Sequence, residues 1–374
     1  SIKKAGGSER NVNLQMPAMP YQMQDALEQL RAGSSTEVQT EIRYCHSSTV
    51  LNMVPTAPGG LYEVNELAQQ LAGLEDWQQE AFDGLLKMEA TKSKNPIPVP
   101  KLIDLAYSTE CCHVVDGVTT DPELGKFYVD NELWGGSENL SEEALAKLDY
   151  AAIGREARLD AGGVFTANSY IEQHSDLIEA SRTLDFKPET PDYTILLEGV
   201  NGGALLKLPM TETELSNTLG YIGAEESAFK CVDCKAPTLI GAARTADGIH
   251  EVNQLASALA EMLPKQLTEY KAILTATKCS EFDDAIQHLG TMEDYIVTRE
   301  YETMEDVALD EMSVIMSPDS VEIMLPYLDL EGYGRALVSG LNADLTAYGM
   351  VERKDRQPVY TPQEQPQQGG MEMT

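Results

Sequence analysis

The chain of 374 residues is poor in basic residues, in aromatic side chains and in long apolar runs. It contains 27 Lys and Arg against 61 Asp and Glu, which gives a formal net charge of -34 at pH 7. This charge disfavours bare nucleic acid and anionic membranes as partners, because both are polyanions. The sequence has no stretch of about 18 apolar residues, so we expect no membrane span. The charge favours a basic protein surface, such as the DNA-binding groove of another protein.

The six cysteines lack the regular spacing of a disulfide-rich secreted domain. Cys231 and Cys234 form a lone Cys-x-x-Cys pair without a second pair at zinc-site spacing, and the five histidines do not cluster, so we expect no metal and no cofactor. Cys111, Cys112 and His113 are adjacent but lack the signature of a catalytic triad. The start of the sequence lacks the apolar core of a signal peptide, and we therefore expect a cytoplasmic protein.

No other motif indicates catalysis. Acidic residues are too numerous to single out a carboxylate pair of the glycosidase type. Gly154-Arg155 recurs as Gly334-Arg335, and we interpret both as structural. The sequence therefore predicts a protein that is not an enzyme, with a thiol- or metal-dependent enzyme as the least favoured alternative.

The sequence contains an internal repeat. Residues 61–72 align with residues 249–260, with seven of twelve positions identical at an offset of 188. The apolar residues of both segments recur at i, i+3, i+4 and i+7, which is typical of an amphipathic helix. Residues 148–155 match residues 328–335 at an offset of 180. Together with a weaker match between the starts of the two halves, these segments predict two tandem copies of roughly 165 residues each.

We predict an α+β fold: an elongated tandem duplication in which each copy has a short-stranded sheet, a helical bundle and a mixed α/β end part. A single helix is expected near residues 142–155 and another near residues 324–337. The predicted parts are, in chain order, residues 1–60, 61–107 and 108–184 (copy 1), 185–191 (a Pro-containing linker), 192–248, 249–290 and 291–353 (copy 2), and 354–374 (a disordered tail).

Each copy carries an acidic stretch between its helical part and its Leu-Asp motif, which is Leu148-Asp149 in copy 1 and Leu328-Asp329 in copy 2. Residues 281–311 contain eleven acidic residues and one basic residue, Arg299, and residues 121–149 contain eight acidic and two basic residues. Duplex DNA carries one negative charge per about 1.7 Å of its axis, so rows of carboxylates can stand in for phosphates. The alternative is a pair of ordinary solvated helix faces. The candidate partner-binding residues are Asp283, Asp284, Glu293, Asp294, Glu300, Glu302, Glu305, Asp306, Asp310, Glu311, Asp121, Glu123, Asp130, Glu132, Glu138, Glu142 and Glu143.

The pattern of the first copy resembles a known family. A helix with x-Glu-Val-Asn-x-Leu-Ala-x-x-Leu, an acidic middle, Leu-Asp-Tyr-x-x-Ile-Gly-Arg at residues 148–155 and a short closing strand are similar to the ArdA-type antirestriction proteins of conjugative elements. The second copy keeps Leu328-Asp329 and Gly334-Arg335. The resemblance implies thin, acidic, three-part proteins that mimic bent duplex DNA and block type I restriction-modification enzymes, usually as homodimers.

The predicted function is therefore an antirestriction DNA mimic of a mobile genetic element. It would competitively block the DNA-binding surface of a type I restriction-modification complex and so evade host defence. Duplication within one chain leaves both a homodimer and an intrachain pseudo-dimer open. A DNA-mimic inhibitor of another DNA-targeting defence system, such as a CRISPR nuclease, is the main alternative.

Overall fold

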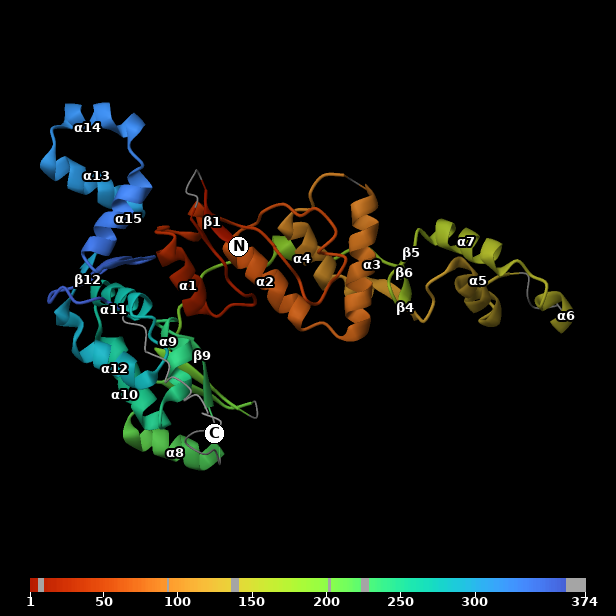
Figure 1. The fold of residues 1–374 in the computed structure, drawn as a ribbon. Helices are drawn as coiled ribbons and strands as arrows, with labels where there is room; N and C mark the ends of the chain where they lie inside the picture. The colour runs from red at the N-terminus through yellow and green to blue at the C-terminus, as the bar shows by residue number, and fades with distance from the viewer. Residues whose placement is uncertain (6–9, 93, 136–140, 201–202, 223–228, 361–374) are drawn as a thin grey trace, which may run out of the picture. The chain divides into compact units, whose positions relative to one another are not determined.

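The computed structural model describes residues 1–5, 10–92, 94–135, 141–200, 203–222 and 229–360. These residues form many helices and four small three-stranded sheets, in which every pair of neighbouring strands is antiparallel (Figure 1). This mixture agrees with the predicted α+β class.

The chain divides into two compact units. Unit 1 comprises Ser1–Ala18 and Leu30–Glu189, and unit 2 comprises Met19–Gln29 and Thr190–Thr374. The chain therefore passes from one unit to the other three times. The sequence predicts that residues 1–60 belong together in copy 1, whereas the structure builds Met19–Gln29 into unit 2.

The elements of unit 1 are, in chain order, β1 (Ile2–Lys4), β2 (Asn11–Val12), η1 (Ser35–Glu37), β3 (Val38–Thr40), α2 (Leu61–Ala72), α3 (Asp76–Lys92), α4 (Val99–Tyr107), η2 (Thr109–Cys111), β4 (Cys112–Asp116), α5 (Asp121–Asp130), α6 (Glu142–Leu145), α7 (Tyr150–Ala161), β5 (Val164–Phe165), β6 (Ser169–Gln173) and η3 (Ala180–Arg182).

The elements of unit 2 are α1 (Pro20–Gln29), β7 (Ile195–Gly199), β8 (Leu205–Leu208), α8 (Glu212–Ile222), β9 (Phe229–Cys234), α9 (Leu239–Ala242), η4 (Ala243–Thr245), α10 (Ile249–Glu261), α11 (Pro264–Ala276), α12 (Phe282–Gly290), η5 (Met292–Asp294), β10 (Tyr295–Thr298), α13 (Met304–Ile315), α14 (Pro318–Met324), η6 (Leu325–Tyr327), α15 (Leu330–Gly340), β11 (Asp344–Thr346) and β12 (Gly349–Arg353).

The sheets of the two units share their strand orders. The first sheet of each unit has its first strand in the middle, with the orders β2-β1-β3 and β8-β7-β9. The second sheet has its last strand in the middle, with the orders β4-β6-β5 and β10-β12-β11. Between the two sheets each unit has a group of helices that carries much of its apolar core.

The two repeated helices begin where the sequence predicts them, at Leu61 in α2 and Ile249 in α10. Each carries a buried Asn whose side chain forms hydrogen bonds with both the N–H and the carbonyl of one residue in the preceding segment. Asn65 accepts a hydrogen bond from the Ala18 N–H at 2.7 Å and donates to the Ala18 carbonyl at 3.2 Å. Asn253 makes the same two bonds to Met210, both at 2.8 Å. The repeated Asn therefore satisfies buried backbone groups in both units.

The single helices expected near residues 142–155 and 324–337 are each interrupted. In unit 1 the interruption falls at Asp149, whose carboxylate accepts the Ala152 N–H at 3.0 Å and caps α7. In unit 2 Asp329 accepts the Gly332 N–H at 2.9 Å and caps α15. The Leu-Asp motif thus begins a helix, because an Asp carboxylate satisfies an N–H group that has no partner within the helix.

The predicted disordered tail begins too early, at residue 354. Val359 is buried against the unit 2 core and donates its N–H to the Asn342 carbonyl at 3.2 Å. Residues 361–374, the rest of that tail, lie outside the described residues.

Candidate acidic binding surface

In unit 1, the predicted carboxylates lie on and beside a closely packed helix pair, α5 and α7 (Figure 1). A Cβ atom added to Gly154 would lie 1.8 Å from the Asp121 carbonyl oxygen, and one added to Gly125 would lie 1.9 Å from the Tyr150 carbonyl oxygen. The two backbones are therefore in direct contact. Glu123, on α5, is exposed.

Unit 2 repeats this contact between α13 and α15. A Cβ atom on Gly334 would lie 1.8 Å from the Met304 carbonyl oxygen. The buried residues of α13 are Val307, Ala308 and Met312, and its exposed carboxylates Asp310 and Glu311 lie between the last two of them in sequence.

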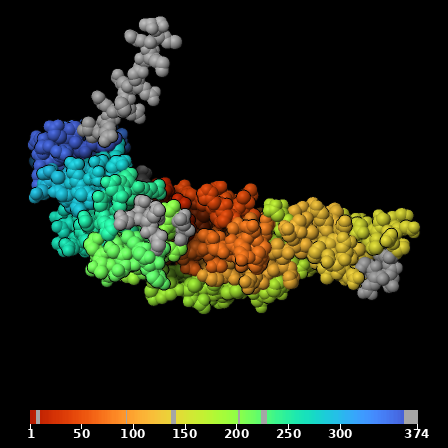
Figure 2. All heavy atoms as spheres, turned by 90° about the horizontal axis from the view of Figure 1, so that it is seen from below, coloured from red at the N-terminus to blue at the C-terminus, as the bar shows by residue number. Residues whose placement is uncertain are grey.

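Most of the predicted carboxylates reach solvent. The α5–α7 segment, yellow in Figure 2, has atoms on the molecular surface. The predicted residues that the structure describes as exposed are Asp283, Glu293, Asp294, Glu300, Glu302, Asp310, Glu311, Glu123, Asp130, Glu132, Glu142 and Glu143.

Four predicted carboxylates are only half exposed, namely Asp121, Asp284, Glu305 and Asp306. Asp121 binds the Arg158 guanidinium, with an Nε–Oδ1 distance of 2.8 Å, and this hydrogen bond lowers the pKa of Asp121. Asp306 accepts the Thr303 N–H at 2.8 Å at the start of α13. Both side chains therefore stabilise their own helix pair or helix start, a role that the sequence analysis did not assign to them.

Two of the exposed carboxylates also have internal partners. Glu123 accepts the Thr119 N–H at 2.8 Å, and this hydrogen bond lowers the pKa of Glu123. Asp310 accepts the Tyr301 hydroxyl at 2.6 Å, which raises the pKa of Tyr301 to about 12. The remaining candidate, Glu138, lies outside the described residues.

All charged side chains in the sequence around α13 are negative. Between Arg299 and Arg335 the chain has ten Asp and Glu and no Lys, Arg or His. In unit 1, by contrast, Lys126 and Lys147 lie within the acidic stretch, and Arg155 and Arg158 follow it. The unit 2 end part is therefore the more purely acidic of the two.

The cysteine pairs lie in the cores of their units. Cys231 and Cys234 are buried, and burial raises the pKa of Cys231 to about 12. Burial likewise raises the pKa of Cys112 to about 12. A raised pKa makes a thiol less reactive as a nucleophile, because the thiolate is the nucleophilic form. In the part of the chain that the structure describes, no three His, Cys, Asp or Glu side chains are grouped so as to hold a metal ion.

The structure brings together two histidines that lie far apart in the sequence, His113 and His174. His113 lies on β4 and His174 follows the paired strand β6, and their ring centroids are 4.4 Å apart. Two imidazoles without a third ligand do not make a zinc site. Their separation of 61 positions gives no sequence signal, because the contact depends on strand pairing.

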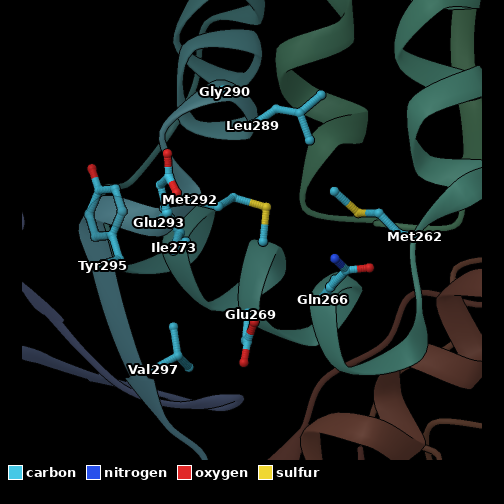
Figure 3. Close-up of a pocket in the computed structure, with 10 residues that line it drawn as sticks. All are labelled: Met262, Gln266, Glu269, Ile273, Leu289, Gly290, Met292, Glu293, Tyr295 and Val297. Carbon is cyan, nitrogen blue, oxygen red and sulfur yellow. The ribbon is translucent and has the colours of Figure 1, made fainter.

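A hollow in unit 2, shown in Figure 3, has a volume of about 530 Å³. It lies between α11, the end of α12 and β10. Its described lining residues include the carboxylates of Glu269 and Glu293 but no Cys, His, Ser, Lys or Arg. Besides these carboxylates, the hydroxyl of Tyr295 is a reactive group among the described lining residues.

A second hollow, of about 520 Å³, lies in unit 1 and is lined in part by Cys45 and His46. The Cys45 sulfur contacts the Ser47 hydroxyl at 3.3 Å, and the His46 ring packs edge-on against Tyr44 at 4.8 Å. Neither contact pairs the thiol with the imidazole, which is the pairing that activates a cysteine nucleophile.

No protein-family model matches the chain, and no curated protein matches it either. No helix among the described residues combines the length and apolar character that crossing a membrane would require.

Proposed function

We propose that the protein is an antirestriction DNA mimic, built as a tandem duplication, that competitively blocks the DNA-binding surface of a type I restriction-modification complex. The observation that carries the proposal is the exposed acidic end part of unit 2, where no cation interrupts the chain from Glu300 to Gly334. Such a surface attracts a basic groove and repels nucleic acid.

The tandem duplication is supported by the parallels between the units. The order of strands in both sheets, the buried Asn in α2 and α10, and the Asp caps of α7 and α15 recur at matching places. A duplicated chain would present two acidic end parts to its target. An elongated arrangement of the copies and an intrachain pseudo-dimer are parts of the same proposal.

The test is inhibition of a purified type I restriction complex by the wild-type protein over a range of salt concentrations. Inhibition should compete with duplex DNA and weaken steeply as salt rises, because ions screen the charges of both surfaces. An absence of inhibition at low salt would overturn the proposed target.

A charge-neutralised variant locates the surface. Glu300→Gln, Glu302→Gln and Glu311→Gln together should weaken inhibition about tenfold at low salt, from roughly 0.5 kcal/mol for each exposed ion pair. Asp306 is left intact because its carboxylate accepts the N–H of Thr303, the N-cap residue of α13.

The matched control removes three exposed charges on and beside α10, with Asp247→Asn, Glu251→Gln and Glu261→Gln. This control should inhibit as the wild type does. Equal losses in the two variants would mean that only net charge matters and would argue against a defined surface.

A further inference from the structure

Helix α1 is built into unit 2, although the residues on both sides of it belong to unit 1. On its N-terminal side, Ala18 is held by both hydrogen bonds of Asn65. On its C-terminal side, Leu30 is buried and the Arg31 carbonyl accepts a hydrogen bond from Lys4 Nζ at 3.1 Å. Each end of α1 therefore lies only one or two positions from the nearest attachment to unit 1, at Ala18 or at Leu30 and Arg31.

The first turn of α1 is fixed to β9 and to Tyr193, which precedes β7 in unit 2. The Tyr21 N–H donates to Asp233 Oδ2 at 3.2 Å, and the Tyr193 hydroxyl donates to the same oxygen at 2.7 Å. The Tyr21 hydroxyl donates to the Tyr193 carbonyl at 2.7 Å. Asp233 thus places a fully buried carboxyl group at the N-terminus of α1, where N–H groups lack partners within the helix.

The last turns of α1 hold a buried cation of α11. Lys271 Nζ lies 2.6 Å from Asp25 Oδ1 and 2.8 Å from Glu28 Oε2, and the side chains of Lys271 and Asp25 are only 4% and 6% exposed. The Tyr348 hydroxyl also donates to Asp25, at 2.9 Å. Burial acts to lower the pKa of Lys271, but the two carboxylates outweigh it and the pKa is raised.

Unit 2 depends on this helix, because an unpaired ammonium in the same place would be strongly unfavourable. The position 188 residues earlier, in α3 of unit 1, is Asp83, which is half-buried and accepts a hydrogen bond from Ser48. Of the two matching helices, only α11 carries a buried cation at this position. It belongs to unit 2, the unit into which α1 packs.

We infer that α1 couples the two units energetically, so that both unfold in one cooperative transition. We call α1 the tie, because it packs in unit 2 while the residues on both sides of it belong to unit 1. Separating α1 from unit 2 uncovers Lys271 and Asp233. Keeping α1 on unit 2 while unit 1 unfolds breaks the flanking attachments at Ala18 and Arg31. Either change therefore transmits destabilisation from one unit to the other.

The test uses the full chain and its two tryptophans, Trp77 and Trp134, which both lie in unit 1. Tryptophan fluorescence reports the unfolding of unit 1, and far-ultraviolet circular dichroism reports all helices. With the tie intact, the two signals should give one common midpoint. Separate transitions in the wild type would overturn the inference.

Leu255→Ala removes a buried side chain from α10, in the core of unit 2. It should lower both midpoints together, by about 5 °C or more. A shift in circular dichroism without a shift in tryptophan fluorescence would show that the units unfold independently, and would overturn the inference.

Lys271→Met leaves Asp25 and Glu28 without their cation and should release α1. In this variant the two midpoints should separate, and adding Leu255→Ala should no longer move the fluorescence midpoint. Common midpoints in Lys271→Met would show that the units are coupled by something other than α1. Where Lys271→Met does not fold, Leu255→Ala alone decides between coupled and independent units.

Discussion

The helix pairs α5–α7 of unit 1 and α13–α15 of unit 2 have the same closest contact but different charges around it. Gly154 and Gly334 each bring a backbone against the carbonyl of the first residue of the partner helix, Asp121 or Met304. In unit 1 that first residue is also paired with Arg158, whereas in unit 2 it is uncharged. Because both pairs form, the glycine contact and not the ion pair is their shared determinant, and the surrounding charge is free to differ.

The largest expected effect comes from breaking the shared contact. Gly154→Ala and Gly334→Ala should each destabilise the protein by about 3 kcal/mol, because the added Cβ would meet rigid backbone rather than a movable side chain. Urea unfolding measures the loss. Gly220→Ala, in α8 with nothing within 4 Å of the new Cβ, is the control and should be stabilising by about 0.5–1 kcal/mol. Full stability of Gly154→Ala would show that α5 and α7 are further apart than described.

Removing the Asp cap of α7 or of α15 should destabilise the protein less than breaking the glycine contact, and by the same amount in both units. Asp149→Ala and Asp329→Ala should each cost about 1 kcal/mol, because each leaves an N–H in the first turn of its helix without a partner. Asn at either position should retain most of the stability, since its side-chain oxygen also accepts a hydrogen bond. A cost in only one unit would show that the caps are not equivalent.

The ion pair between Asp121 and Arg158 should make the stability of the α5–α7 pair depend on pH more than that of the α13–α15 pair. The pKa of Asp121 is lowered by Arg158, so its contribution is present above its unfolded pKa of about 3.9 and is lost as pH falls through the lower folded pKa. Arg158→Met should cost about 0.5–1 kcal/mol at pH 7 and less at a pH below the folded pKa of Asp121, where the carboxyl group is protonated. In α15, Arg335→Met removes an exposed pair with Glu331 and should have little effect at either pH. A pH-independent cost of Arg158→Met would mean that it acts by packing alone.

The smallest effect concerns like-charge repulsion. Glu311→Gln should leave stability within about 0.5 kcal/mol and shift it upward, because the removed charge lies in a stretch without cations. Glu132→Gln, in the stretch that contains Lys126 and Lys147, should be closer to neutral. Thermal unfolding at low salt compares the two variants, and added salt should reduce the difference between them.

For the candidate surface, the sequence names the carboxylates to consider but does not show which of them have partners within the protein. Twelve of them are exposed, as a charged side chain usually is. Asp121, in contrast, is held by an arginine 37 positions away. That pairing depends on how α5 meets α7, and no local pattern contains it.

The sequence by itself determined the local features of this protein: the starts of α2 and α10 follow from apolar periodicity, and the excess of carboxylates is a property of composition. Only the tertiary structure decided where α1 belongs. Its ten residues lie in the first half of the sequence, yet their partners are Asp233, Lys271 and Tyr348, more than 200 positions along the chain. A helix is set by neighbours in sequence, whereas its place in a unit is set by the buried charges and apolar surface that it must satisfy, and these come together only when the chain folds.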